Sequence, residues 1–103
     1  MQVIDTVKPD DLIDERSLSK LKWRCRRGLL ENDLFIERFF KRFESRLTVK
    51  QVQGLTLLMD LSDNDLLDLH LGRKTPEQID TGLARDDVYE VLTMLRIPPE
   101  RPL

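Results

Sequence analysis

Residues 32–47 read NDLFIERFFKRFESRL and carry the strongest helical pattern in the chain. Apolar side chains recur there at positions i, i+3, i+4, i+7 and i+11, the spacing of one face of an α-helix. All four phenylalanines of the chain lie in this segment, and we predict that they fill the core of the protein instead of stacking on a ligand. Phe35 fits the apolar stripe least well; the stripe consists of Ile36, Phe39, Phe40, Phe43 and Leu47.

The segment before it predicts a first helix from about Asp11 or Ser17 to Arg27. Gly28 follows directly, where a glycine in the left-handed region commonly ends a helix. The apolar residues that this helix would turn inward are Leu18, Leu21 and Cys25.

Capping signals predict the helices that follow. Thr48 and Gln51 have the spacing of a capping box, and Ser62 is a suitable N-cap for a fourth helix that stops at Gly72. Because glycine inside a helix costs about 1 kcal/mol relative to alanine, we attribute Gly54 to a close approach between two helices. The third helix has the apolar stripe Val52, Leu55, Leu58 and Met59; a capped turn at 75–78 and a last helix from about Ala84 to Ile97 complete the series.

These elements predict an all-α fold, a compact antiparallel bundle of about five short helices. A length of 103 residues is typical of a single domain, which we expect to span residues 1–103. Within it, we expect residues 1–16 to form an N-terminal extension and residues 98–103, which begin with two prolines, to form a frayed tail.

Composition argues against an enzyme that works alone. The chain has one cysteine and one histidine, which excludes an intrachain disulfide, a zinc site of several cysteines and a histidine-based metal cluster. Its four glycines are scattered, so there is no glycine-rich phosphate loop. Cys25 lies on an apolar stripe and is predicted to be buried, and His70, near a helix end, is predicted to favour the negative end of the helix dipole.

The net charge of −2 conceals an uneven distribution. The segment Lys20–Lys50 contains ten basic and four acidic residues, whereas the segments on either side are net acidic. This asymmetry favours an acidic partner, although an ordinary solvated helix surface can show the same pattern. No apolar run approaches the roughly 18–20 residues of a membrane span, and the N-terminal residues lack the pattern of a signal or transit peptide, so we expect a cytoplasmic protein.

The sequence WRCRRGLLEND at residues 23–33 is the most unusual local cluster. Three arginines within four residues predict an exposed cationic edge, and Gly28 leaves room for a ligand or another backbone. Glu31 and Asp33 are expected at the start of the next helix, near its free N–H groups. From the residues alone, the cluster is either a binding corner or an ordinary capped turn between two helices.

Residues 27–31, RGLLE, form an RGxxE motif within the wider pattern WxCRRGxxExD, and a phenylalanine-rich helix follows it. In this context the chain resembles the succinate dehydrogenase flavinylation factors, also called succinate dehydrogenase assembly factors. The likeness covers roughly residues 18–76 and includes the patterns DxDL at 63–66 and GRKxP at 72–76. Many members of that family carry a tryptophan where this chain has Leu69.

The resemblance implies a small helical protein without catalysis of its own. Members of the family bind the flavoprotein subunit of succinate dehydrogenase, in some bacteria also that of fumarate reductase, and promote covalent attachment of FAD to a histidine of that subunit. Flavinylation is then an autocatalytic reaction of the partner, and the factor holds no FAD stably. The residues that the resemblance assigns to the partner contact are Arg27, Gly28 and Glu31, with Arg26 and Asp33 as less strictly matched positions.

We hypothesise that Arg27 and Glu31 make charge-assisted contacts with the flavoprotein, while Gly28 permits the close approach. A rival interpretation is a small nucleic-acid-binding or antitoxin-like module, based on the basic side chains between Lys20 and Arg27. The acidic net charge and the lack of interleaved polar side chains for base readout argue against it. A third interpretation, an enzyme that uses Cys25, requires an exposed thiol with a lowered pKa.

Overall fold

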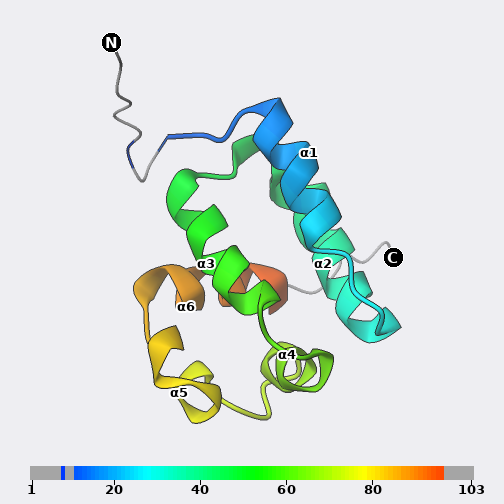
Figure 1. Cartoon of the computed structure of the whole chain (residues 1–103), viewed down its shortest axis with the longest axis vertical. Coiled ribbons are helices and arrows are strands. Elements are labelled where there is room, and N and C mark those ends of the chain that lie inside the picture. Colours follow the sequence, from blue (N-terminus) through cyan, green and yellow to red (C-terminus); the bar gives the residue numbers. More distant parts are fainter. Residues whose placement is uncertain (1–7, 9–10, 97–103) are drawn as a thin grey trace, which may run out of the picture.

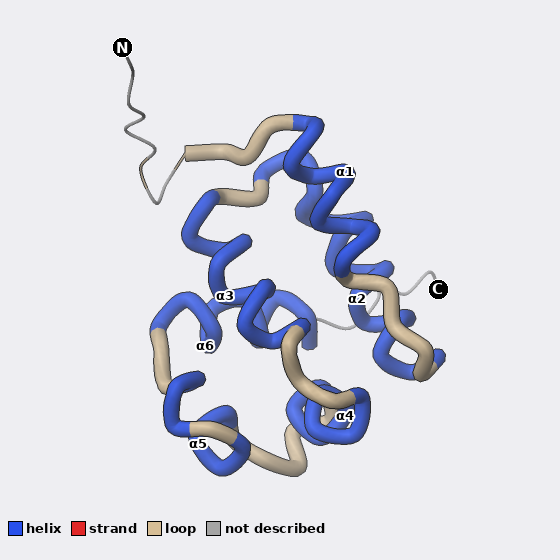
Figure 2. Tube along the Cα trace, viewed as in Figure 1, coloured by secondary structure: helices blue, strands red, loops and turns tan. Residues whose placement is uncertain are grey.

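The computed structural model describes residue 8 and residues 11–96 of the chain. Over this part it forms six α-helices and two short 3-10 turns, and no β-strand (Figure 2). The all-α prediction is confirmed, with five longer helices where five were predicted and a four-residue helix at the predicted capped turn. The helices are α1 (Glu15–Arg24), α2 (Leu30–Phe43), α3 (Val49–Met59), α4 (Asp63–His70), α5 (Pro76–Ile79) and α6 (Asp86–Arg96); the 3-10 turns are Glu44–Arg46 and Thr81–Leu83.

Helix α6 is central to the packing because it contacts α2, α3 and α4, and α2 contacts α4 as well. The most extensive contact between two helices of the described part joins α3 and α6. Helix α1 lies alongside α2 (Figure 1), and Lys22 of α1 forms a 2.8 Å ion pair with Glu44, just beyond the end of α2. Ahead of α1, an isolated antiparallel bridge between Leu12 and Thr48 ties the incoming chain to the start of α3.

One hydrophobic core joins side chains from α1, α2, α3, α4 and α6. Phe39 and Phe40 lie in this core and Phe43 packs against it, as predicted. Phe35 is not part of the core cluster; its ring stacks on that of His70 with 4.5 Å between the centroids. The amphipathic pattern of α2 therefore identified the side of the helix that faces the core. Phe35, which fitted the pattern least well, packs against His70 instead.

Gly54 lies where α3 meets α6, which confirms the reason predicted for this glycine. A Cβ atom at this position would be 2.4 Å from the backbone oxygen of Asp87. Backbone atoms cannot rotate out of the way as the end of a flexible side chain can. Only glycine therefore allows the two helices to approach so closely.

Capping chemistry sets two of the helix starts in the predicted way. Thr48 and Gln51 form the capping box of α3. The hydroxyl of Ser62 accepts a hydrogen bond from the backbone N–H of Asp65 at the start of α4. These local hydrogen bonds satisfy N–H groups that the helices themselves leave free.

The predicted end of the first helix is wrong. The helix ends at Arg24 instead of Arg27, and Gly28 lies in the loop beyond it. Gly28 is not in the left-handed region; within the described part of the chain, the only positive φ belongs to Gly72. The loop leaves the helical path because the backbone N–H of Arg27 donates to the carboxylate of Asp33 on α2 at 2.9 Å.

Other helix boundaries in the structure differ from the predicted ones by a few residues. Helix α1 starts at Glu15, and α6 starts at Asp86 instead of Ala84. The predicted end of the last helix at Ile97 and the predicted tail 98–103 lie outside the described residues. No helix in the described ranges is both long enough and apolar enough to cross a membrane.

Candidate functional site

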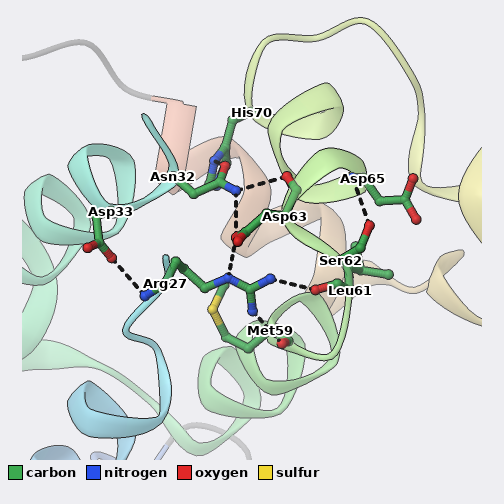
Figure 3. A network of polar contacts seen from close by, with 9 residues as sticks. All are labelled: Arg27, Asn32, Asp33, Met59, Leu61, Ser62, Asp63, Asp65 and His70. Atoms are coloured by element: carbon green, nitrogen blue, oxygen red, sulfur yellow. Dashed lines mark hydrogen bonds and ion pairs between the residues drawn. The ribbon is translucent and has the colours of Figure 1, made fainter. Parts of the chain in front are cut away.

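The loop between α1 and α2 carries the start of the RGxxE motif, and its arginine points into the protein (Figure 3). Arg27 Nε donates to Asp63 Oδ1 at 2.8 Å, and Nη1 donates to the Met59 carbonyl at 2.8 Å. Nη2 donates to the Leu61 carbonyl at 2.6 Å. Through these hydrogen bonds, Arg27 holds the loop against the α3–α4 connection. Only 13% of its side chain is exposed, so Arg27 is not part of the predicted cationic edge.

Asp63, the first residue of α4, receives donors from both the loop and α2. Asn32 Nδ2 donates to the Asp63 carboxylate at 3.1 Å and to its backbone carbonyl at 2.9 Å. The hydrogen bonds from Arg27 and Asn32, aided by the charge of Arg27 and the backbone N–H of Leu29, hold the pKa of Asp63 below its ordinary value. The carboxylate is therefore ionised at neutral pH and links the loop, α2 and α4.

Asn32 is fully buried and also reaches the far end of α4. Its Oδ1 lies 3.0 Å from His70 Nδ1. Because the Asn32 amide nitrogen donates to Asp63, the amide oxygen is the group that faces His70, and it can only accept. His70 Nδ1 is therefore the donor and carries the ring proton. Burial and the charges of three nearby arginines lower the pKa of His70 to about 4. The ring is thus neutral near pH 7, so His70 has a structural role as predicted, but through its contact with Asn32 instead of through the negative end of the helix dipole.

The outer side of the loop faces solvent. Gly28 and Glu31 are exposed, and a Cβ atom on Gly28 would be 3.9 Å from its nearest neighbour, Asp63 Oδ2. Arg26 is also exposed, and its guanidinium lies 5.0 Å from the centroid of the Trp23 indole. This side of the corner therefore offers a carboxylate, a guanidinium and an uncrowded stretch of backbone to a partner.

An open groove of about 840 Å³ runs between α1 and α2 beside this edge. Three of its lining residues are apolar and exposed: Trp23 at 71%, Leu30 at 67% and Leu34 at 46%. Apolar side chains gathered on a surface are typical of protein–protein contact regions. The groove extends the exposed edge of the loop along the two helices.

The structure divides the predicted site residues into two groups. Arg26, Gly28 and Glu31 are exposed, whereas the side chain of Arg27 turns inward. Asp33 is half-buried, lines the groove and accepts a hydrogen bond from the backbone N–H of Arg27. Sequence reasoning missed Asn32 and Asp63 as parts of this corner. The DxDL pattern marks the first turn of α4, where carboxylates are common because they interact favourably with the helix dipole. The pattern therefore does not reveal that Asp63 pairs with Arg27, which lies 36 positions earlier in the sequence.

The state of Cys25 bears on the interpretation of this residue as a catalytic nucleophile. Cys25 is fully buried, as predicted, and burial raises the pKa of its thiol to about 12. A thiol in this state is a poor nucleophile, so the interpretation of Cys25 as a catalytic residue lacks its required basis. Within the residues that the structure covers, no three His, Cys, Asp or Glu side chains come together as a candidate metal site.

Known proteins match this chain over most of its length. Residues 19–99 match the family described as the flavinator of succinate dehydrogenase. The chain is 45% identical over 96 residues to the FAD assembly factor SdhE of Ralstonia nicotianae, which covers 93% of this chain and 98% of that protein. It is 36% identical over 84 residues to the FAD assembly factor SdhE of Legionella pneumophila strain Lens, which covers 82% of this chain and 96% of that protein.

No solved structure gives a significant match to the chain. The sequence comparisons agree with the resemblance inferred from the RGxxE motif and its surroundings, and the family match runs through the last helix to residue 99. The chain therefore belongs to the succinate dehydrogenase flavinator family.

Proposed function

We propose that this chain is an FAD assembly factor that binds the flavoprotein subunit of succinate dehydrogenase and promotes covalent attachment of FAD to it. The observation that carries the proposal is the family match over residues 19–99, which includes the RGxxE motif with its exposed Gly28 and Glu31. Two relatives named FAD assembly factor, each matched over at least 96% of its length, support it. A protein that acts on a partner in this way needs no catalytic residue of its own.

In this scheme a histidine of the flavoprotein would bond to the 8α carbon of the flavin. The methyl group and the histidine would each give up a proton, and the flavin ring would take up the electron pair until an electron acceptor reoxidises it; we assign that reaction to the partner's own groups. A bound factor can accelerate it by holding the partner's histidine and flavin in near-attack geometry. It can also place a charge near the flavin ring, where charge develops during the reaction. In this scheme FAD becomes part of the partner and is not a stable ligand of this chain.

Within the corner, we assign the partner contact to Gly28, Glu31 and Arg26. Glu31 and Arg26 present opposite charges to solvent, and both are suited to charge-assisted hydrogen bonds. Gly28 lets a partner backbone approach because nothing crowds its Cβ position. Arg27 from the inner side and Asp33 from α2 shape the loop, which changes the hypothesis that Arg27 itself contacts the flavoprotein.

Co-expression with the succinate dehydrogenase flavoprotein subunit of the same organism tests this proposal. In-gel flavin fluorescence after denaturation reports covalent FAD, and co-purification reports binding. The wild type should raise the fluorescence, whereas Gly28→Arg and Glu31→Ala should not. Asp86→Ala is the matched control, because Asp86 is also an exposed carboxylate in the first turn of a helix, α6.

The same experiment can reject the proposal. A wild type that neither binds the flavoprotein nor raises its fluorescence would contradict it. Steep salt-dependent binding to duplex or single-stranded nucleic acid would then favour the nucleic-acid-binding module. Repeating the assay with the flavoprotein of fumarate reductase determines whether that subunit is a second client.

A further inference from the structure

We propose that Asp63 is a positioning residue for the RGxxE loop: its carboxylate fixes the loop in the geometry that Gly28 and Glu31 need to meet the partner. This inference rests on the proposed function of the loop. Asp63 itself is not assigned to the partner contact. Its role is to connect the exposed motif to the core of the protein.

The loop is built around this carboxylate, which lies between Arg27 and Asn32 in Figure 3. Asp63 Oδ1 accepts hydrogen bonds from Arg27 Nε at 2.8 Å and from Asn32 Nδ2 at 3.1 Å. The backbone N–H of Leu29 also stabilises the charged form of the carboxylate. These donors precede and follow Gly28 in the chain, so one carboxylate holds both sides of the glycine.

Asp63 can serve as a fixed point because α4 is anchored along its length. Leu66 and Leu69 of α4 are fully buried in the core. At the other end of the helix, His70 holds the side chain of Asn32, which is itself fully buried. The first turn of α2, which carries Glu31, is therefore attached to both ends of α4.

Asp65 is the control position that distinguishes this role from a general effect of negative charge at the start of α4. Both carboxylates lie in the first turn of α4, where the helix dipole favours either one. Figure 3 shows the Asp65 side chain directed away from Arg27 and from the loop. Substituting Asp65 thus removes a first-turn charge from the same helix without removing a contact to the motif.

The variants of Asp63 have distinct expected effects. Asp63→Asn keeps the side-chain size but removes the charge, and Asp63→Ala removes the acceptor. Both should speed hydrogen exchange of the backbone amides at 28–31 and weaken binding to the apo-flavoprotein by about tenfold or more, since a loop that is not preorganised must be ordered on binding. Asp63→Glu, which keeps the charge, should recover part of the affinity, and Asp65→Asn should match the wild type.

The test combines amide exchange of the free protein, followed by NMR, with calorimetric titration of the apo-flavoprotein. Both are measured at a temperature at which circular dichroism shows every variant fully folded, so that loss of fold cannot imitate loss of position. If wild type binds but Asp63→Asn and Asp63→Ala exchange and bind like Asp65→Asn, the positioning role is wrong while the proposed function stands. If the wild type itself does not bind, the proposed function fails and the positioning role fails with it.

Discussion

Two glycines show how differently two helix contacts of this protein are built. Gly54 lies between α3 and α6, where a Cβ atom would be 2.4 Å from a backbone oxygen. Gly28 lies at the corner between α1 and α2, where the nearest neighbour of a Cβ atom would be 3.9 Å away. The first glycine is required by the packing of the fold, whereas the second leaves a surface that a partner can approach.

Two neighbouring arginines at the α1–α2 corner show the same contrast. Arg27 is largely buried and donates to a carboxylate and two backbone carbonyls. Arg26 is exposed and stacks on Trp23. The corner therefore has an inner side, which an ion pair and hydrogen bonds hold together, and an outer side, which carries the exposed motif residues Gly28 and Glu31.

The largest expected effect follows from closing the space at the α3–α6 contact. Gly54→Val places branched carbon atoms against the backbone of α6, and overpacking of this kind costs about 3 kcal/mol. For a domain of this size, that corresponds to a fall in Tm of roughly 10–20 °C. Thermal unfolding followed by circular dichroism measures it, and a Tm near that of the wild type would show that α3 and α6 can separate without loss.

Removing the inner brace should have the next largest effect. Arg27→Ala leaves the carbonyls of Met59 and Leu61 without their donor, and lost hydrogen bonds of this kind cost about 1–3 kcal/mol. Arg26→Ala is the matched control, because its guanidinium makes only an exposed stacking contact and should change the free energy of unfolding by less than about 0.5 kcal/mol. Urea unfolding of the two variants compares them directly, and equal losses would contradict the division of the corner into an inner and an outer side.

The sequence predicted those features that depend on local spacing. The apolar stripe of α2, the capping box at Thr48 and the N-cap at Ser62 each involve residues within a few positions of one another. The reason for Gly54 was also inferred locally, because a glycine inside a helix needs an explanation. For the same reason, the fold class and the position of the motif at a helix corner could be predicted.

The inner side of the corner could not be predicted because its contacts join distant parts of the chain. A run of arginines before a glycine indicates positive charge, but it does not show which guanidinium turns inward. That choice depends on Asp63 and on the backbone carbonyls of Met59, at the end of α3, and Leu61, just beyond it, all more than 30 positions away in sequence. Likewise, the burial of His70 against Asn32 and Phe35 depends on how α2 and α4 pack.

Lowering the pH should reduce the free energy of unfolding in two steps, through His70 and then Asp63. The pKa of His70 is about 4 in the folded protein against an ordinary value of 6.5, so the unfolded chain takes up this proton first as the pH falls. Stability should therefore decrease from about pH 6.5 toward pH 4, by at most about 1.4 kcal/mol per pH unit. The pKa of Asp63 is lowered from 3.8, so its contribution is present above that value and is lost at lower pH, as the pH falls through its folded pKa.

Urea unfolding at pH 7, 6 and 5 checks the first of these steps. His70→Phe, which keeps a ring beside Phe35 but cannot take up a proton, should flatten the dependence between about pH 6.5 and pH 4. A dependence as steep in His70→Phe as in the wild type would assign the acid sensitivity to other groups.

The smallest expected effect on stability comes from the other glycine. Gly28→Arg adds a long side chain at an exposed position with a free Cβ direction, so the free energy of unfolding should change by less than about 0.5 kcal/mol. The same side chain should stand between the loop and the flavoprotein and abolish the gain in covalent flavin. Thermal unfolding and in-gel flavin fluorescence of one preparation measure both effects. A Tm lowered as far as in Gly54→Val would mean that Gly28 is a packing residue too, and normal flavinylation would mean that the partner meets another face.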